Sequence, residues 1–147
     1  MVRTNSLADD ETWVVIFGNG YDSASGNAAL YLLNPKTGDI IKKMVADNPS
    51  IGSGNGLSSP IAVDVNADEK VDFVYAGDLK GNMWKFDLTS TSYQNWDVAF
   101  EQSSAPKPLF TTSGGISQPI TTRPDVMKHC TQDGYLVFFG TGKYLEE

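Results

Sequence analysis

The sequence predicts an all-β protein built from repeated units, and three observations lead to this prediction. The apolar runs are short and rich in aromatic and β-branched residues. Steps rich in Gly, Pro and Asn separate the runs, as turns separate strands. No window keeps a helical period beyond two turns. The expected strands are 13–17, 28–33, 40–45, 61–63, 73–76, 83–88, 109–111 and 135–139.

A strand that ends in glycine recurs at a nearly constant spacing. The segments that end at Gly18, Gly77 and Gly140 resemble one another, and their glycines are 59 and 63 residues apart. A second marker keeps the first of these steps, because Ser59-Pro60-Ile61 recurs as Gln118-Pro119-Ile120 after 59 residues. A period of about 60 residues with roughly four short strands fits one blade of a β-propeller. We expect a single region, 1–147, with repeat units at about 11–58, 59–117 and 118–147.

Two to three four-stranded blades are too few to close a propeller ring, which takes about four to eight. We therefore expect the chain to be a piece of a larger β-propeller. The open strand edges of such a piece would favour self-association. The N-terminus has no apolar signal core. A signal peptide would accordingly lie outside this fragment.

Composition excludes several classes of function. The net charge is −7, from 11 basic and 18 acidic residues, which argues against nucleic acid and anionic membrane surfaces as partners. No apolar run approaches the ~18–20 residues of a membrane span. The single Cys130 cannot form an internal disulfide, and the lone His129 provides neither a zinc site nor a convincing catalytic triad. We expect a protein that is not an enzyme.

The stretch 64–72 is the most informative part of the chain. Asp64, Asn66, Asp68 and Asp72 occupy positions 1, 3, 5 and 9 of a short loop, and the carbonyl of Lys70 stands at position 7. This spacing matches the oxygen ligands of an EF-hand-type calcium loop. Both flanks read as short strands, so the loop would be a turn that a metal ion closes. The pattern predicts one Ca²⁺ site with these five residues as ligands.

Chemistry favours calcium over other metals in this loop. Zinc would require His or Cys, and magnesium demands a stricter octahedron. The alternative is an acidic hairpin turn in which Asp and Asn side chains cap backbone groups. The loop departs from the usual pattern at position 6, where Glu69 replaces glycine, and at position 12, where Tyr75 replaces glutamate. A non-Gly residue with positive φ costs ~1 kcal/mol, so we expect modest affinity.

Several motifs together resemble the C-terminal domain of the PilC/PilY family of type IV pilus proteins. They are the segments 18–21, 29–33, 56–60, 75–88, 118–124 and 139–145. The resemblance covers nearly the whole chain, about residues 11–146. The combination of motifs is specific, although no single motif is.

The resemblance implies a modified β-propeller that is distantly like quinoprotein dehydrogenases. It also implies a calcium site in a D-x-[DN]-x-D-x-x-x-D loop, which falls on the same five residues. Members of the family act in pilus extension and retraction, twitching motility and surface adhesion. The expected partners are pilins, minor pilins or host surfaces. The expected location is exported, at the pilus tip, the outer membrane or the cell surface of a bacterium.

Two alternatives keep a propeller but change its function. A quinoprotein-type dehydrogenase would need aromatic rings that stack on the quinone and an arginine near it. Trp13, Trp84 and Arg123 are the candidates, although we expect both tryptophans to pack between sheets. An integrin-like propeller with FG-GAP repeats would carry a calcium loop in successive blades. Here the acidic pattern occurs once, which weakens that alternative.

Overall fold

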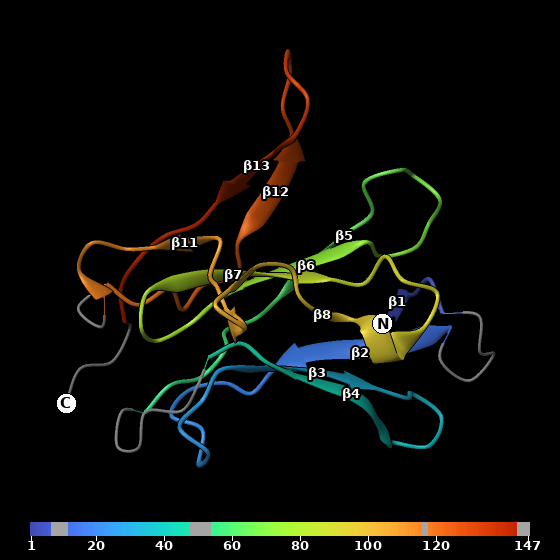
Figure 1. Cartoon of the computed structure of the whole chain (residues 1–147), viewed down its shortest axis with the longest axis horizontal. Coiled ribbons are helices and arrows are strands. Elements are labelled where there is room, and N and C mark those ends of the chain that lie inside the picture. The colour runs from blue at the N-terminus through green and yellow to red at the C-terminus, as the bar shows by residue number, and fades with distance from the viewer. Residues whose placement is uncertain (7–11, 48–53, 116–117, 144–147) are drawn as a thin grey trace.

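The structure is a computed structural model, and it describes residues 1–6, 12–47, 54–115 and 118–143. The described chain consists of short β-strands and one turn of 3₁₀-helix, η2 (Figure 1). The elements are β1 Val2–Arg3, β2 Trp13–Gly18, β3 Ala29–Leu33, β4 Ile40–Val45, β5 Ile61–Val63, β6 Phe73–Gly77, β7 Asn82–Asp87, η2 Tyr93–Asn95, β8 Asp97–Val98, β9 Glu101–Gln102, β10 Ala105–Pro106, β11 Phe110–Thr111, β12 Asp125–Lys128 and β13 Tyr135–Phe138.

The strands form two main sheets and two hairpins. The first sheet is antiparallel with the order β1-β2-β3-β4. The second sheet has the order β11-β7-β6-β5, and β8 also pairs with β7. The hairpin β9–β10 follows β8, and the hairpin β12–β13 projects beyond the second sheet at the top of Figure 1. The fold is therefore an open part of a β-propeller, as the sequence predicted.

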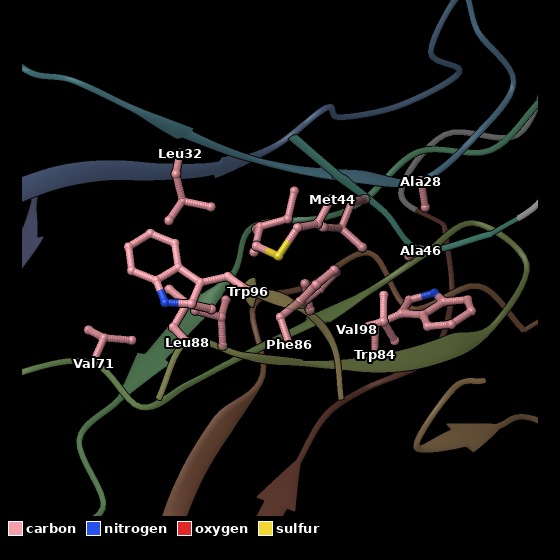
Figure 2. Packing of buried hydrophobic residues seen from close by; sticks show 14 of the residues in the cluster. Ala28, Leu32, Met44, Ala46, Val71, Trp84, Phe86, Leu88, Trp96 and Val98 are labelled. Atoms are coloured by element: carbon pink, nitrogen blue, oxygen red, sulfur yellow. The ribbon is translucent and has the colours of Figure 1, made fainter. Parts of the chain in front are cut away.

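The main hydrophobic core lies between the two sheets (Figure 2). The first sheet contributes Leu30, Leu32 and Met44, all of which are essentially buried. From the second sheet, Trp84 and Phe86 point toward them. A smaller cluster of Tyr75, Met83 and Ile120 lies on the opposite face of the second sheet, under the β12–β13 hairpin.

The central strand β6 is buried on both faces. Val74 and Ala76 belong to the main core, whereas Tyr75 between them belongs to the smaller cluster. Successive side chains of a strand point to opposite faces, so alternate residues of β6 contribute to two different cores. This explains why the strand reads as a continuous apolar run rather than as an alternation of apolar and polar residues.

Two of the three glycines that mark the repeat are required by close backbone approach. A Cβ on Gly18 would overlap with the carbonyl oxygen of Leu57 and lie 2.5 Å from that of Ser58. A Cβ on Gly77 would likewise lie 2.5 Å from the carbonyl oxygen of Ile120. In both cases a strand end is crossed by the segment that leads to the next sheet or hairpin. The recurring glycine thus has a packing reason.

The expected strands are all present, with bounds that differ by no more than one residue. Sequence analysis missed β1, β8, β9, β10 and β12, which are two to four residues long.

The expectation that Trp13 packs between sheets is wrong, because Trp13 is 49% exposed, whereas Trp84 is 2% exposed in the core. The second sheet also has a fifth strand. The proposed unit boundaries stay a prediction, and residues 11, 48–53, 116–117 and 144–147 within them lie outside the described residues.

Candidate metal centre

The loop 64–72 joins β5 to β6 and leaves one end of the second sheet (Figure 1). The ladder between the two strands ends at the pair Val63 and Phe73. The backbone N–H of Asp72 donates to the carbonyl oxygen of Val63 at 2.9 Å and closes the loop. The expected ligands therefore stand on one turn between two antiparallel strands, which confirms the predicted context.

The carboxylate of Asp64 is the centre around which the loop folds. Its Oδ1 accepts hydrogen bonds from the N–H groups of Asn66 at 3.1 Å, Ala67 at 2.7 Å and Asp68 at 3.3 Å. Its Oδ2 accepts one from the N–H of Glu69 at 2.7 Å. Desolvation would raise the pKa of Asp64, but these hydrogen bonds to the ionised form outweigh it and lower the pKa.

Asn66 and Asp68 continue the same pattern along the loop. The Oδ1 of Asn66 accepts the N–H of Asp68 at 2.9 Å, and the Oδ1 of Asp68 accepts the N–H of Lys70 at 3.0 Å. The ammonium of Lys70 also lies 3.4 Å from Oδ2 of Asp68. Both partners of this ion pair are about a third exposed, so the pair adds little stability.

Asp72 differs from the other acidic residues because it is buried, with 4% of its surface exposed. Its Oδ2 accepts the N–H of Val65 at 2.9 Å. Its Oδ1 faces the side-chain amide of Asn5 at 3.5 Å. The same amide group donates to the carbonyl oxygen of Val71 at 3.0 Å and to that of Leu88 at 3.3 Å. Asp72 thus ties the loop to the N-terminal segment.

Position 6 of the loop has the conformation that the calcium pattern requires. Glu69 has a φ of 68°, in the left-handed region that glycine usually occupies, and its side chain is exposed. Ala67 also lies there, with a φ of 63°. The expected backbone cost at Glu69 is therefore real. The loop turns sharply at position 6 without the residue that makes this turn easy.

The loop carboxylates do not converge on one point in this structure. Within the described ranges, no three Asp, Glu, His or Cys side chains lie together in a position to hold a metal ion. The donors have the oxygen chemistry that calcium prefers. Their oxygens, however, accept hydrogen bonds from the backbone of the loop itself. An ion would therefore compete with these N–H groups for some of the same oxygens.

Two residues from distant parts of the chain contact the loop, and sequence analysis identified neither. Asn5 lies 67 residues from Asp72, and Tyr135 lies 70 residues from Val65. The hydroxyl of Tyr135 donates to the carbonyl oxygen of Val65 at 2.9 Å. Neither residue belongs to a local motif, so only the tertiary fold reveals these contacts.

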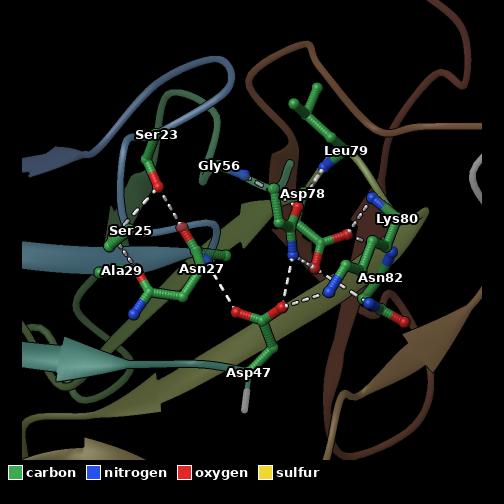
Figure 3. A network of polar contacts seen from close by, with 12 residues as sticks. Ser23, Ser25, Asn27, Ala29, Asp47, Gly56, Asp78, Leu79, Lys80 and Asn82 are labelled. Carbon is green, nitrogen blue, oxygen red and sulfur yellow. Dashed lines mark hydrogen bonds and ion pairs between the residues drawn. The ribbon is translucent and has the colours of Figure 1, made fainter. Parts of the chain in front are cut away.

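A second polar cluster, which we call the Asp78 network, connects the two sheets (Figure 3). Asp78 has no exposed surface. Its Oδ1 accepts the N–H groups of Lys80 at 2.9 Å and Asn82 at 2.8 Å. Its Oδ2 accepts side-chain N–H groups from Asn82 at 2.9 Å, Asn55 at 3.1 Å and Trp84 at 2.8 Å. Asp78 is therefore a cap that folds the turn after β6.

Asp47 extends this network to the first sheet. Its Oδ1 accepts the N–H of Ala28 at 2.7 Å, and its Oδ2 accepts the amide of Asn55 at 2.8 Å. The ammonium of Lys80 forms an ion pair with the same oxygen at 2.9 Å. Among the described residues, no buried side-chain nitrogen or oxygen lacks a hydrogen-bond partner. These contacts give the network a structural role.

The structure rules out Trp84 as a residue that stacks on a quinone. The ring of Trp84 is enclosed in the core and its N–H is bound to Asp78, so the ring is not available to stack on a cofactor. Arg123 is exposed on the surface.

In the described part of the chain, no helix is long and apolar enough to span a membrane.

Comparison with known proteins places the chain in one family. It matches the family model of the PilY1 β-propeller domain over residues 4–147. It is 40% identical over 148 residues to the type IV pilus biogenesis factor PilY1 of Pseudomonas aeruginosa strain PAO1, an alignment that covers 91% of this chain and 13% of that protein. A PilY1 homolog of Xylella fastidiosa is 38% identical over 144 residues, which covers 90% of this chain and 10% of that protein.

A solved structure shows the same relationship in three dimensions. The chain aligns with the crystal structure of the P. aeruginosa PilY1 C-terminal domain at a TM-score of 0.82 and 37% identity. This alignment covers 99% of the chain and 32% of that domain. The chain thus spans a small part of its curated relatives, 10 to 13% of their length. Sequence and structure agree that the chain belongs to the family of PilY1 β-propeller domains.

Proposed function

We propose that the chain is a calcium-binding segment of a propeller that serves type IV pilus assembly. Its relatives bear the name type IV pilus biogenesis factor, which supports the pilus role. By this relationship the parent protein acts in pilus extension and retraction, twitching motility and surface adhesion. Its partners would be pilins, minor pilins or host surfaces, and its place would be the pilus tip, the outer membrane or the cell surface. The role is one of assembly and not of catalysis.

One observation carries the calcium part of the proposal. Four oxygen-bearing side chains stand at positions 1, 3, 5 and 9 of a turn whose position 6, Glu69, has a φ of 68°. Residues with a bulky side chain adopt this conformation at a cost, and it is the conformation that calcium loops need at this position.

Binding would require the loop to rearrange. Calcium takes six to eight oxygen ligands at about 2.3–2.6 Å. Asp68 would leave Lys70, and the carboxylates of Asp64, Asp68 and Asp72 would move closer together. This movement would strain hydrogen bonds within the loop. That strain would reduce the net free energy of calcium binding. We therefore place the affinity among weaker calcium sites, with a dissociation constant of about 10⁻⁵ to 10⁻³ M.

Isothermal titration of the purified chain with CaCl₂, and separately with MgCl₂, tests this proposal. We expect one calcium ion per chain and much weaker magnesium binding, because magnesium demands stricter geometry. Two or more tight calcium sites would instead support the integrin-like alternative. Absence of calcium binding at millimolar concentration would contradict the proposal and leave the loop as a turn capped by its own side chains.

Asp68→Ala separates a ligand role from a capping role. Asp68 is exposed, and from the described residues its side chain accepts the N–H of Lys70 alone, besides its ion pair with that residue. We expect the variant to lower the melting temperature in calcium and to leave it nearly unchanged in EDTA. Asp97→Ala, which removes an exposed carboxylate outside the loop, is the control and should not alter the calcium response. Equal losses with and without calcium would argue for capping alone.

A further inference from the structure

We propose that the Asp133–Gly134 step, at the tip of the β12–β13 hairpin, is a site of spontaneous isomerisation of aspartate to isoaspartate. The chain has one Asp–Gly step and two Asn–Gly steps, at Asn19 and Asn55, that could undergo this type of reaction. The fold leaves the first step free to react and holds the other two. The site lies on a different element from the loop 64–72 and does not depend on an ion there.

The reaction joins a side-chain carbon to the next backbone nitrogen. The nitrogen of Gly134 attacks Cγ of the protonated Asp133 carboxyl group, the N–Cγ bond forms and one water molecule leaves. A second water molecule then opens the five-membered succinimide ring at either carbonyl carbon. Opening at Cγ restores aspartate, whereas opening at the backbone carbonyl leaves the chain running through Cγ as isoaspartate. The final mass of the chain is unchanged, and the reaction needs no cofactor.

The hairpin tip leaves both reacting groups free. The tip lies beyond the second sheet at the top of Figure 1, and Asp133, Gly134 and residues 130–132 are all exposed. Within the described residues, neither the Asp133 carboxylate nor the N–H of Gly134 has a hydrogen-bond partner. Gly134 has a φ of 124°, which residues with a side chain rarely adopt. The turn therefore requires glycine, the residue that hinders the attack least.

Asn55 is held by the Asp78 network and cannot turn toward the following nitrogen. It has no exposed surface, and its Oδ1 accepts the N–H groups of Gly56 at 2.9 Å and Leu79 at 3.0 Å. Its Nδ2 donates to Asp47 at 2.8 Å and to Asp78 at 3.1 Å. Attack by the nitrogen of Gly56 would require all of these contacts to break.

Asn19 is held in a similar way. Its Oδ1 accepts the N–H groups of Ala29 at 3.0 Å and Leu57 at 2.9 Å, and its Nδ2 donates to the carbonyl oxygen of Asn27 at 2.8 Å. The attacking N–H of Gly20 is itself bound to the carbonyl oxygen of Leu57 at 2.9 Å. A flexible peptide would react faster at Asn–Gly, because its amide is neutral at pH 7. The folded chain should instead protect both Asn–Gly steps.

Isoaspartate would loosen the turn that closes the hairpin. The N–H of His129 donates to the carbonyl oxygen of Gly134 at 3.0 Å. The Nδ1 of His129 accepts the N–H groups of Thr131 at 3.3 Å and Gln132 at 3.0 Å. One more backbone atom between Asp133 and Gly134 would displace the Gly134 carbonyl from His129. Loss of this hydrogen bond should speed hydrogen exchange at the His129 amide by about fivefold.

Ageing of the full chain in H₂¹⁸O at pH 7, once folded and once in guanidinium chloride, tests the proposal. Peptide mapping by mass spectrometry then reports ¹⁸O uptake at each step. The Asp133–Gly134 step should react within about threefold of its unfolded rate, because the tip is already open. Asn19 and Asn55 should react at least about tenfold more slowly in the folded chain, because they react only after local opening. Asp133→Glu, whose longer side chain disfavours the five-membered ring closure, should remove the signal at the tip alone.

Absence of isoaspartate at position 133 in the folded chain would overturn the proposal. Protection of this step to the same degree as the two Asn–Gly steps would also overturn it, because the tip would then be held. Chromatography separates the isomerised chain for hydrogen exchange. Unchanged exchange at His129 in that fraction would refute the loosening of the turn, whereas faster exchange there with an unchanged core would support it.

Discussion

At the scale of single residues, two side chains of the loop act in opposite directions on its stability. The carboxylate of Asp64 gathers four backbone N–H groups and stabilises the turn. Glu69 lies in a backbone conformation that L-residues disfavour. The fold thus retains a locally unfavourable residue at the position where calcium loops normally have glycine. Strain of this kind often occurs at functional sites.

Glu69→Gly should stabilise the protein even without calcium. Removing the unfavourable φ gains about 1–2 kcal/mol, and the greater freedom of glycine in the unfolded chain costs about 0.5–1 kcal/mol. We expect a net gain of about 0.5–1 kcal/mol in urea unfolding. Thr91→Gly, at an exposed loop position without a positive φ, should instead lose stability and serves as the control. A loss in Glu69→Gly would show that the strain is not present in solution.

Asp64 should make part of the stability depend on pH. Its pKa in the folded protein is lowered from the ordinary value of 3.8, so the folded state binds its proton less readily than the unfolded state. This contribution is present above pH 3.8 and is lost as the pH falls through the lowered pKa. Asp64→Asn lacks the titrating group. The difference in melting temperature between the two proteins should therefore narrow below pH 3.8. A constant difference down to pH 2 would contradict this assignment.

At the scale of elements, glycine allows a connecting segment to pass closely over the end of a strand. Gly77 ends β6 where the backbone and side chain of Ile120 pass directly over it. Gly140 follows β13 at the corresponding place in the repeat, but a Cβ there would meet only Thr122 Oγ1 at 3.9 Å. Of these two repeat glycines, Gly77 is therefore required by packing, whereas Gly140 is not.

Gly77→Ala should destabilise the protein far more than Gly140→Ala. The added methyl group at position 77 would collide with the side chain and the carbonyl oxygen of the buried Ile120, which we expect to cost about 3 kcal/mol. At position 140 it would make an ordinary contact, and we expect a change within about 1 kcal/mol. Urea unfolding of the two variants measures the contrast. Similar small losses in both would mean that the Ile120 crossing shifts easily.

The strands that could be predicted from sequence are those that the core requires. β2, β3, β6 and β7 are short apolar runs bounded by turn residues and supply many of the buried side chains, so local pattern and tertiary packing agree. β12, Asp125–Lys128, has only two apolar residues between two charged ones and forms because it pairs with β13. Its formation depends on a partner ten residues away, which local propensity does not reveal.

The candidate site, too, could be predicted only in part. The ligand set of the loop could be predicted because it is contiguous in sequence. Its anchors could not, because Asn5 and Tyr135 reach it only through the packing of elements far apart in the chain. The hydrogen bonds that occupy the carboxylates are those of the capping alternative that the sequence also offered, and only the structure shows which N–H groups they bind.

At the scale of the whole molecule, the first sheet has one covered and one open face. The open face carries the large side chains of Trp13, Phe17 and Ile40, with exposures of 49%, 39% and 57%. Phe17 stacks on Tyr31 of the neighbouring strand, with ring centroids 5.4 Å apart. Several large apolar side chains exposed on one sheet face are typical of a surface that another sheet or chain covers.

The isolated chain should therefore self-associate through this face. We expect its mass by light scattering to rise above 15.9 kDa with increasing concentration. Phe17→Thr combined with Ile40→Thr keeps β-forming residues and removes apolar surface, and it should restore the monomeric mass. Phe138→Thr, a change of the same kind on the hairpin, is the control and should not restore it. A chain that remains monomeric at high concentration would contradict the prediction.

The double burial of β6 restricts how this part of the molecule can change its length. Inserting one amino acid within the strand would move Tyr75 to the side where Ala76 now fits and would move Val74 beneath the hairpin. A single insertion would therefore disrupt the packing of both hydrophobic clusters. Relatives of this protein should therefore accommodate insertions and deletions in their turns, and alignments of the family should show a gap-free block at 73–77.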